Sequence, residues 1–360
     1  MIKVLLVYHA LCSGEFKYAG MEKMLVWLGN ALADKGYDVT FCTLFDTERC
    51  VLYSPKVHSI ELALPYYSSF FKRNIVIFIR GLQKLQKVVS QDYDYVVNFG
   101  DTMFFLLVIL KTYNNYKLIT SERGDPYNCS NFLERLRRKM VKCSNYIVFQ
   151  TNGARDFYGE VIKKRSCIIP NPIVIPQQEW NQDDTNKHVA FVGRIDFWQK
   201  RLDVLVEAFA KFKSLHPDYI LDIYGSGNIK ELKRIVEKLY LSENVIIHGA
   251  VSDVNEKLLL SELFILTSDF EGIPNALLEA MAIGMPVIST NCSPGGAAFL
   301  IENYKNGILV DCGDTEAIAN SINYLVENRD KAKLMGQRAR ISMKKYDPQQ
   351  IIALWSAILK

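Results

Sequence analysis

The chain has 360 residues, of which 49% are hydrophobic and 23% charged, so it is long enough for two globular domains with full cores. No apolar run reaches the roughly 18 to 20 residues of a membrane span, and the short apolar N-terminus does not have the pattern of a secretory signal. We therefore expect a cytoplasmic protein. The longest apolar run, residues 103–110, is expected to form a buried strand or helix segment.

Charge is uneven along the chain. Residues 1–172 hold 23 of the 43 Lys and Arg and 15 of the 39 Asp and Glu, so this half carries +8 and the remainder −4. A basic first half indicates an anionic partner, such as a lipid surface or a phosphorylated acceptor, although solvated charge without a partner is an alternative. The eight cysteines are scattered singly, without the spacing of metal ligands, and are expected to be reduced thiols.

In the first half, short apolar runs alternate with helix-length segments. Residues 2–8 are typical of a strand buried on both faces, and a glycine loop, an amphipathic helix ending near Gly36 and a second strand follow. Strand-like runs recur at residues 94–100, 116–122 and 145–151. This alternation predicts an α/β fold with a doubly wound parallel sheet.

Residues 169–187 contain three prolines and no periodicity, which indicates an interdomain linker. Alternation then restarts, with a helix expected over residues 203–216 and strands up to residue 310, so the second domain is also Rossmann-like. We place the domains at residues 1–172 and 173–345, and expect a C-terminal helix at residues 346–360 to pack back on the first domain. Ligands of such sheets bind at the carboxyl ends of the strands, which predicts a site in a central cleft between the two domains.

Two acids flank a turn in the second domain. Glu271 and Glu279 lie eight positions apart in the stretch DFEGIPNALLEAMAIGMPV. Eight helical residues rise about 12 Å, which disfavours a glycosidase pair, whose carboxyl groups lie roughly 5 to 9.5 Å apart. If a helix begins at Pro274, its free N–H groups favour an anion between the two acids. A nucleotide sugar fits this layout, with hydroxyls at both ends and a diphosphate in the middle. In the alternative interpretation, one acid caps the helix and the other is an unrelated surface glutamate, so that the pair marks no site.

Arg194 and Lys200 strengthen the first interpretation. Arg194 follows a predicted strand and Lys200 is placed at the start of the next helix, so both would reach the cleft. Two cations there can neutralise a leaving diphosphate.

In this order, VGR, a following lysine, LDIYGSG, NVIIHGAV and DFEGIPNALLEAMAIGMPVIST resemble the retaining glycosyltransferases of family 4, which have the GT-B fold, and in particular those that build bacterial surface polysaccharides. The resemblance implies that Arg194 and Lys200 bind the diphosphate, that Glu271 contacts the donor sugar, and that Glu279 binds the ribose. Glu271, Arg194 and Lys200 are then the catalytic residues. The donor site implied as a whole comprises Gly20, Gly193, Arg194, Lys200, Ala250, Val251, Glu271, Gly272, Ile273, Pro274, Asn275, Ala276, Leu277 and Glu279.

The chain also departs from the family pattern. Lys200 follows Arg194 by six positions, one more than is common, which implies an insertion near Phe197 or Trp198. The stretch AGME (residues 19–22) keeps only one glycine of the GGxE loop that it resembles. TSERGDPY stands where many members carry a histidine, so Glu122, Arg123 and Asp125 are placed on the acceptor side.

The basic stretches that begin at Phe70 and Phe132 indicate either attachment to an anionic membrane or helices with solvated cations. The resemblance implies an enzyme that needs neither metal nor cofactor and that transfers a hexose or N-acetylhexosamine from a nucleotide sugar, with UDP expected, to a glycan. The acceptor is expected to be lipid-linked, at the inner face of the cell membrane, and no nucleic-acid partner is indicated. DYD at residues 92–94 imitates a metal motif, but a strand-entry turn is favoured. A nucleotide-sugar 2-epimerase and a non-catalytic sugar-nucleotide-binding module are the alternatives.

Overall fold

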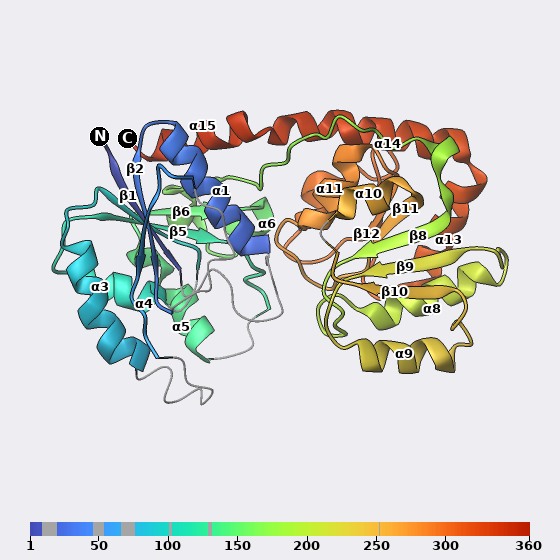
Figure 1. Ribbon diagram of the computed structural model, residues 1–360, viewed down its shortest axis with the longest axis horizontal. Helices are drawn as coiled ribbons and strands as arrows, with labels where there is room; N and C mark the ends of the chain where they lie inside the picture. Colours follow the sequence, from blue (N-terminus) through green and yellow to red (C-terminus); the bar gives the residue numbers. More distant parts are fainter. Residues whose placement is uncertain (9–19, 46–53, 66–75, 101–102, 129–131, 252) are drawn as a thin grey trace. The chain divides into compact units, whose positions relative to one another are not determined.

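The computed structural model describes residues 1–8, 20–45, 54–65, 76–100, 103–128, 132–251 and 253–360. The chain divides into two compact units. Unit 1 contains Met1–Gln150, Ala154–Ile169 and Ile351–Lys360, and unit 2 contains Thr151–Gly153 and Pro170–Gln350. Each unit is built on a parallel sheet with flanking helices (Figure 1), which confirms the predicted fold class.

Unit 1 has a seven-stranded sheet in the order β3-β2-β1-β4-β5-β6-β7. All neighbouring strands pair in parallel. The strands are β1 (Lys3–Tyr8), β2 (Asp38–Thr43), β3 (His58–Glu61), β4 (Tyr95–Asn98), β5 (Lys117–Glu122), β6 (Tyr146–Phe149) and β7 (Ser166–Ile168).

The helices of residues 1–169 and the C-terminal helix are α1 (Gly20–Asp34), η1 (Ile77–Gly81), α3 (Leu82–Val89), α4 (Met103–Leu110), α5 (Phe132–Met140), η2 (Val141–Cys143), α6 (Asn152–Asp156), α7 (Glu160–Lys163) and α15 (Pro348–Ile358). After the exposed Lys3, β1 is apolar because helices cover both faces of its sheet (Figure 1). Val4 and Leu6 belong to the core cluster with α1, whereas Leu5 and Val7 belong to the one with α3 and α4.

The C-terminal helix α15 belongs to the core of unit 1. Ile351, Ile352 and Trp355 are buried in the same cluster as Val4 and α1. The Trp355 ring is stacked on Phe99, with 6.3 Å between ring centroids. The end of the chain therefore completes the helical layer over one face of the first sheet.

Unit 2 has a six-stranded parallel sheet in the order β10-β9-β8-β11-β12-β13. Its strands are β8 (Asn186–Val192), β9 (Ile220–Tyr224), β10 (Val245–Gly249), β11 (Ser261–Leu266), β12 (Val287–Thr290) and β13 (Ile308–Val310). Its helices are η3 (Gln182–Asp184), α8 (Leu202–Lys213), α9 (Ile229–Lys238), α10 (Val254–Leu259), α11 (Asn275–Ile283), α12 (Gly296–Leu300), α13 (Thr315–Glu327), α14 (Arg329–Met343) and η4 (Lys344–Tyr346).

Three boundaries differ from the sequence prediction. Residues 103–110, left open between strand and helix, form α4. α8 covers Leu202–Lys213 rather than residues 203–216. Arg201 before it adopts a left-handed conformation with φ of 52°, which fixes the start of the helix at Leu202. α11 begins at Asn275, and Pro274 is its N-cap with an extended ψ of 115°, so the predicted start at Pro274 was one residue early.

The strand order of unit 2 places a site. β8 lies in the middle of the sheet. The chain continues from it to β9 and β10 on one side, and β11, β12 and β13 lie on the other side. In open parallel sheets, ligands bind outside the carboxyl ends of the strands at such a reversal. The two loops concerned are those that follow β8 and β11.

Candidate active site

The loops after β8 and β11 bring together a cation and an acid. Lys200 Nζ and Glu271 Oε1 form an ion pair, and the Ser268 hydroxyl donates to the same oxygen at 2.8 Å. The two charged side chains are 14% and 10% exposed. The sequence predicted both residues as donor ligands 71 positions apart, and the structure places them in contact.

Backbone contacts fix the loops that carry this pair. The Lys200 N–H donates to Asp196 Oδ1 at 3.0 Å. The Glu271 N–H donates to the Ser293 carbonyl at 2.8 Å, which ties the loop after β11 to the segment after β12. Lys200 lies two residues before α8 rather than in its first turn. Its ammonium is therefore positioned by a loop contact and not by a helix.

Arg194 lies beside this pair and is more open to solvent. Its side chain is 59% exposed. Its Nη2 donates to Gln199 Oε1 at 2.6 Å, and Gln199 Nε2 donates to the Phe270 carbonyl at 3.1 Å. Gln199 therefore links Arg194 to the residue directly before Glu271, a role that the sequence analysis missed.

Two close backbone approaches require glycine around the site. A Cβ on Gly225 would lie 1.8 Å from the Gly193 carbonyl oxygen, and one on Gly296 would lie 1.5 Å from that of Gly272. Real Cβ atoms do not approach oxygen so closely, so these contacts exclude any side chain. Gly193 therefore packs against Gly225 in the loop after β9, and Gly272 packs against Gly296 of α12. The GSG motif that contains Gly225 allows this close packing.

The N-terminus of α11 supplies the rest of the predicted donor loop. Ile273 and Leu277 are buried in the core, so these two can offer a ligand only their backbone. The Asn171 amide donates to Asn275 Oδ1 at 2.6 Å, which holds the first residue of the helix. Glu279 lies in the second turn and is half-buried. The helix dipole favours an anion at this end.

The remaining residues predicted for the donor site are dispersed over the two units. Ala250 and Val251 directly follow β10, and the Gly249 carbonyl before them accepts a hydrogen bond from Gly225 N–H at 2.7 Å. Ala276 is half-buried in the first turn of α11. Gly20 is exposed at the start of α1 in unit 1, and Ala19 lies outside the described residues.

Trp198, near the predicted insertion, forms an aromatic contact in the loop after β8. The Trp198 ring, 62% exposed, packs edge-on against Phe270 with 4.5 Å between centroids. Arg201 at the end of this loop pairs with Asp269 at 2.8 Å and with Asp203 at 3.0 Å. The sequence analysis did not identify this ion-pair cluster, although its residues adjoin Lys200 and Phe270.

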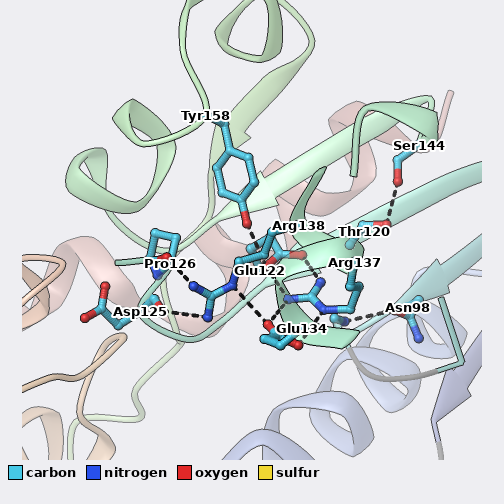
Figure 2. Close-up of polar contacts among 11 residues, drawn as sticks. Asn98, Thr120, Glu122, Asp125, Pro126, Glu134, Arg137, Arg138, Ser144 and Tyr158 are labelled. Carbon is cyan, nitrogen blue, oxygen red and sulfur yellow. Dashed lines mark hydrogen bonds and ion pairs between the residues drawn. The ribbon is translucent and has the colours of Figure 1, made fainter. Parts of the chain in front are cut away.

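In unit 1, Glu122, which was predicted on the acceptor side, belongs to a polar network (Figure 2). Arg137 of α5 contacts both carboxylate oxygens of Glu122, at 2.9 Å for Oε2, and its Nη2 donates to Glu134 at 2.7 Å. The Tyr158 hydroxyl donates to Glu122 at 3.2 Å. Burial alone would lower the pKa of Arg137, but Glu122 and Glu134 outweigh it and raise this pKa. Burial, with the Glu122 charge adding to it, also raises the pKa of Tyr158.

The two neighbours of Glu122 have different contacts. The Arg123 guanidinium lies over the Phe99 ring at 4.6 Å, and burial lowers its pKa to about 9. The Asp125 side chain is buried and accepts from the Tyr127 N–H at 2.9 Å. The acceptor-side role of these three residues stays a prediction.

The DYD stretch forms a turn before β4, as the sequence analysis favoured. Asp92 has a positive φ of 57°, and Asp94 Oδ2 accepts from the Lys3 N–H at 2.7 Å. Among the described residues, no group of three or more His, Cys, Asp or Glu is placed to hold a metal ion. Within the same residues, every helix is too short or too polar to span a bilayer.

Comparison with known proteins agrees with this geometry. Residues 176–342, which include both loops of the candidate site, match the model of the family described as glycosyl transferases group 1. This segment of the chain belongs to that family. A glycosyltransferase of Haemophilus influenzae, itself uncharacterized, is 27% identical to this one over 344 residues, which cover 94% of this chain and 96% of the relative.

Another relative has a named substrate. The GalNAc-α-(1→4)-GalNAc-α-(1→3)-diNAcBac-PP-undecaprenol α-1,4-N-acetyl-D-galactosaminyltransferase of Campylobacter jejuni is 23% identical to this chain over 364 residues, covering 100% of this chain and 98% of the relative. Among solved structures, Anabaena HepE in complex with UDP and glucose superimposes with a TM-score of 0.80 at 19% identity, covering 100% of this chain and 99% of HepE. This likeness confirms the GT-B fold.

Proposed function

We propose that this glycosyltransferase moves a hexose or N-acetylhexosamine from a UDP-sugar to a lipid-linked glycan, with retention of the anomeric configuration, as a member of family 4. The observation that carries the proposal is the contact between Lys200 and Glu271 beside Arg194, at the strand reversal of unit 2. Two cations, Arg194 and Lys200, can bind a diphosphate, and the nearby acid Glu271 can accept hydrogen bonds from the hydroxyls of a sugar ring.

The donor's groups are assigned to individual residues. Arg194 and Lys200 bind the diphosphate, with Arg194 on the solvent side because its side chain is the more exposed. Glu271 accepts hydrogen bonds from the sugar hydroxyls, and Glu279 from the ribose. The N–H groups at the start of α11 face the phosphates, where the helix dipole adds to the stabilisation.

The reaction exchanges one bond at the anomeric carbon for another. The bond from C1 of the sugar to the diphosphate oxygen breaks, and UDP leaves with the electron pair. The acceptor hydroxyl oxygen attacks C1 from the same face, and its proton passes to the departing phosphate oxygen. Lys200 and Arg194 stabilise the charge that develops on the diphosphate, so the protein's contribution is positioning and electrostatics.

The named relatives support the donor and acceptor classes. HepE binds UDP and glucose, and the Campylobacter relative acts on an undecaprenol-linked glycan. We assign this chain by analogy to cell-surface polysaccharide assembly at the cytoplasmic face of the membrane. In this proposal Arg194 and Lys200 neutralise the charge of the diphosphate, and neither a metal nor a cofactor takes part.

A donor panel tests the proposal. Thermal shift with UDP-, GDP- and dTDP-sugars should show stabilisation by UDP-sugars above all, and the best donor is then incubated with a prenyl-diphosphate-linked glycan. We expect a glycan extended by one sugar, with the donor's anomeric configuration by NMR. Conversion of the donor to its 2-epimer without acceptor would identify an epimerase instead, and absence of any nucleotide-dependent shift would reject the proposal.

A further inference from the structure

Unit 1 contains a cavity that the donor site does not use. It has a volume of about 630 Å³ and lies between α5, η2 and residues 157–162. Much of its wall is apolar, from Phe132, Leu136, Val141, Phe157 and Ile162. A cavity of this size accommodates a segment of a small-molecule ligand.

Hydrogen bonds of Arg137 and Arg138 hold α5, which forms one wall of the cavity, in place. Arg137, which does not line the cavity, binds Glu122 and Glu134 (Figure 2). Arg138, at the cavity edge, donates to the backbone carbonyls of residues 125, 126 and 128. These bonds fix the rotation of the helix, so the face that it presents to the cavity is set by the fold.

The face of α5 toward the cavity combines apolar and cationic residues. Phe132, Arg135, Leu136 and Lys139 follow the spacing of one helical stripe, and all four line the cavity. Lys142 adds a third cation directly after the helix. Among the described residues, no carboxylate lies within 4.0 Å of the charged atoms of Arg135, Lys139 or Lys142, whereas Arg137 and Arg138 are both paired.

Aromatic rings surround the same cavity and are open to solvent. Phe132 is 75% exposed and Phe157 is 42% exposed. Phe157 packs edge-on against Tyr127 at 5.0 Å, and Tyr127 is exposed as well. Exposed aromatic groups beside unpaired cations are typical of surfaces that meet the interface of a lipid bilayer.

From this combination we infer that the cavity binds the lipid anchor of the acceptor, a prenyl or acyl chain that ends in a phosphate or diphosphate. The apolar wall takes the first carbons of the chain, and Arg135, Lys139 and Lys142 bind the phosphate oxygens. A phosphate-bearing polymer without a lipid would leave the apolar wall unused, and a neutral lipid would leave the three cations unpaired. The inference deepens the proposed function, on which the identity of the lipid as an acceptor rests.

A binding experiment on the full chain tests the inference. Calorimetry with farnesyl phosphate, farnesol and inorganic phosphate should show the tightest binding for farnesyl phosphate, because it alone has both parts. In Arg135→Gln/Lys139→Gln we expect binding about 10- to 30-fold weaker, since each cation near an anionic lipid contributes roughly fivefold. Phe157→Ala should weaken farnesyl phosphate and farnesol alike. Lys230→Gln/Lys233→Gln, on exposed positions of α9, is the matched control and should bind like the parent.

The outcomes separate the possible occupants. Equal affinity of parent and Arg135→Gln/Lys139→Gln for farnesyl phosphate would overturn the inference, and so would inorganic phosphate binding as tightly as farnesyl phosphate. If UDP binds and farnesyl phosphate does not, the cavity assignment fails while the proposed function stands. If farnesyl phosphate binds and no nucleotide does, the proposed function fails, while the cavity is still a binding site for a phosphorylated lipid. In transfer assays, the double variant should raise KM for a lipid-linked acceptor and leave the rate with the same glycan lacking the lipid unchanged.

Discussion

The two units each hold a buried ion pair just past a strand, and the two pairs are built differently. In unit 1, Glu122 at the end of β5 pairs with Arg137, and both side chains are at most 7% exposed. In unit 2, Lys200 pairs with Glu271 in the loops after β8 and β11, where the exposure is slightly greater. The two pairs differ in how many hydrogen bonds the carboxylate oxygens of Glu122 and Glu271 already accept from the protein.

The Glu122 pair is closed by other protein groups. Both of its carboxylate oxygens receive bonds from Arg137, Tyr158 binds Oε2, and Glu134 occupies the rest of the guanidinium (Figure 2). In the Lys200 pair, Ser268 and Lys200 share Oε1 of Glu271, and no described residue donates to Oε2. Protein groups complete the hydrogen bonding of the first pair, whereas Oε2 of Glu271 in the second pair accepts no bond from a described residue. We therefore expect the first pair to contribute to stability, and we propose that the second binds a ligand.

The largest effect is expected where the closed pair is broken. Arg137→Met leaves Glu122 buried without its cation, which should cost about 3 to 5 kcal/mol of unfolding free energy. Chemical denaturation followed by circular dichroism measures this loss. Arg135→Met, on the same helix but exposed and unpaired among the described residues, is the control and should change stability by about 0.5 kcal/mol or less. Equal stability of the two variants would remove the distinction between the pairs.

The open pair should show the opposite separation of stability from activity. Glu271→Gln keeps the shape of the side chain but removes its charge, and transfer should fall about 100- to 1000-fold, the range for one strong polar contact in a transition state. Unfolding free energy should change far less than in Arg137→Met. Glu237→Gln on α9 is the matched control in a transfer assay. A Glu271→Gln enzyme with parental activity would contradict the assigned role.

A smaller effect is expected for the residue that positions Arg194. Gln199→Ala removes the link between Arg194 and the Phe270 carbonyl, so the cation loses its fixed orientation. We expect KM for the UDP-sugar to rise about fivefold, which corresponds to the loss of one neutral hydrogen bond of about 1 kcal/mol. The kcat should be nearly unchanged. Steady-state kinetics measures both. A fall in kcat with KM constant would show that Gln199 acts in the chemical step instead.

Metal removal should have the smallest effect. If Arg194 and Lys200 neutralise the diphosphate, dialysis against EDTA leaves the rate of sugar transfer unchanged. The assay is repeated with added Mn²⁺ and Mg²⁺. Loss of transfer in EDTA with recovery in Mn²⁺ would require a metal site that the two cations do not replace.

The sequence predicted the elements whose signal is local. The apolar runs predicted the inner strands of both sheets, because strands buried on two faces are mostly apolar, as is β1 after Lys3. They missed the edge strands β3 and β7, which are not fully buried. Lys200 and Glu271 were predicted for one site from their motifs and from the family resemblance that these motifs carry. The structure places the two side chains in contact.

What the sequence could not show depends on long-range contacts. Arg137 stands among cations in FLERLRRKM, and nothing local distinguishes the one buried against Glu122 from the exposed Arg135. The approach of Gly225 to Gly193 joins two loops after different strands, so no spacing rule reveals it. The start of α8 was misplaced because the left-handed turn at Arg201 carries no glycine signal.

The central claim is that Arg194 and Lys200 hold the diphosphate of the donor. Calorimetric titration of UDP into the parent and into Arg194→Ala/Lys200→Ala tests it most directly, with Lys230→Gln/Lys233→Gln as the charge-matched control. We predict affinity about 100-fold weaker in the double alanine variant, since each removes a charge-assisted bond of roughly 1.5 kcal/mol, and parental affinity in the control. UDP binding of equal strength in all three proteins would contradict the account.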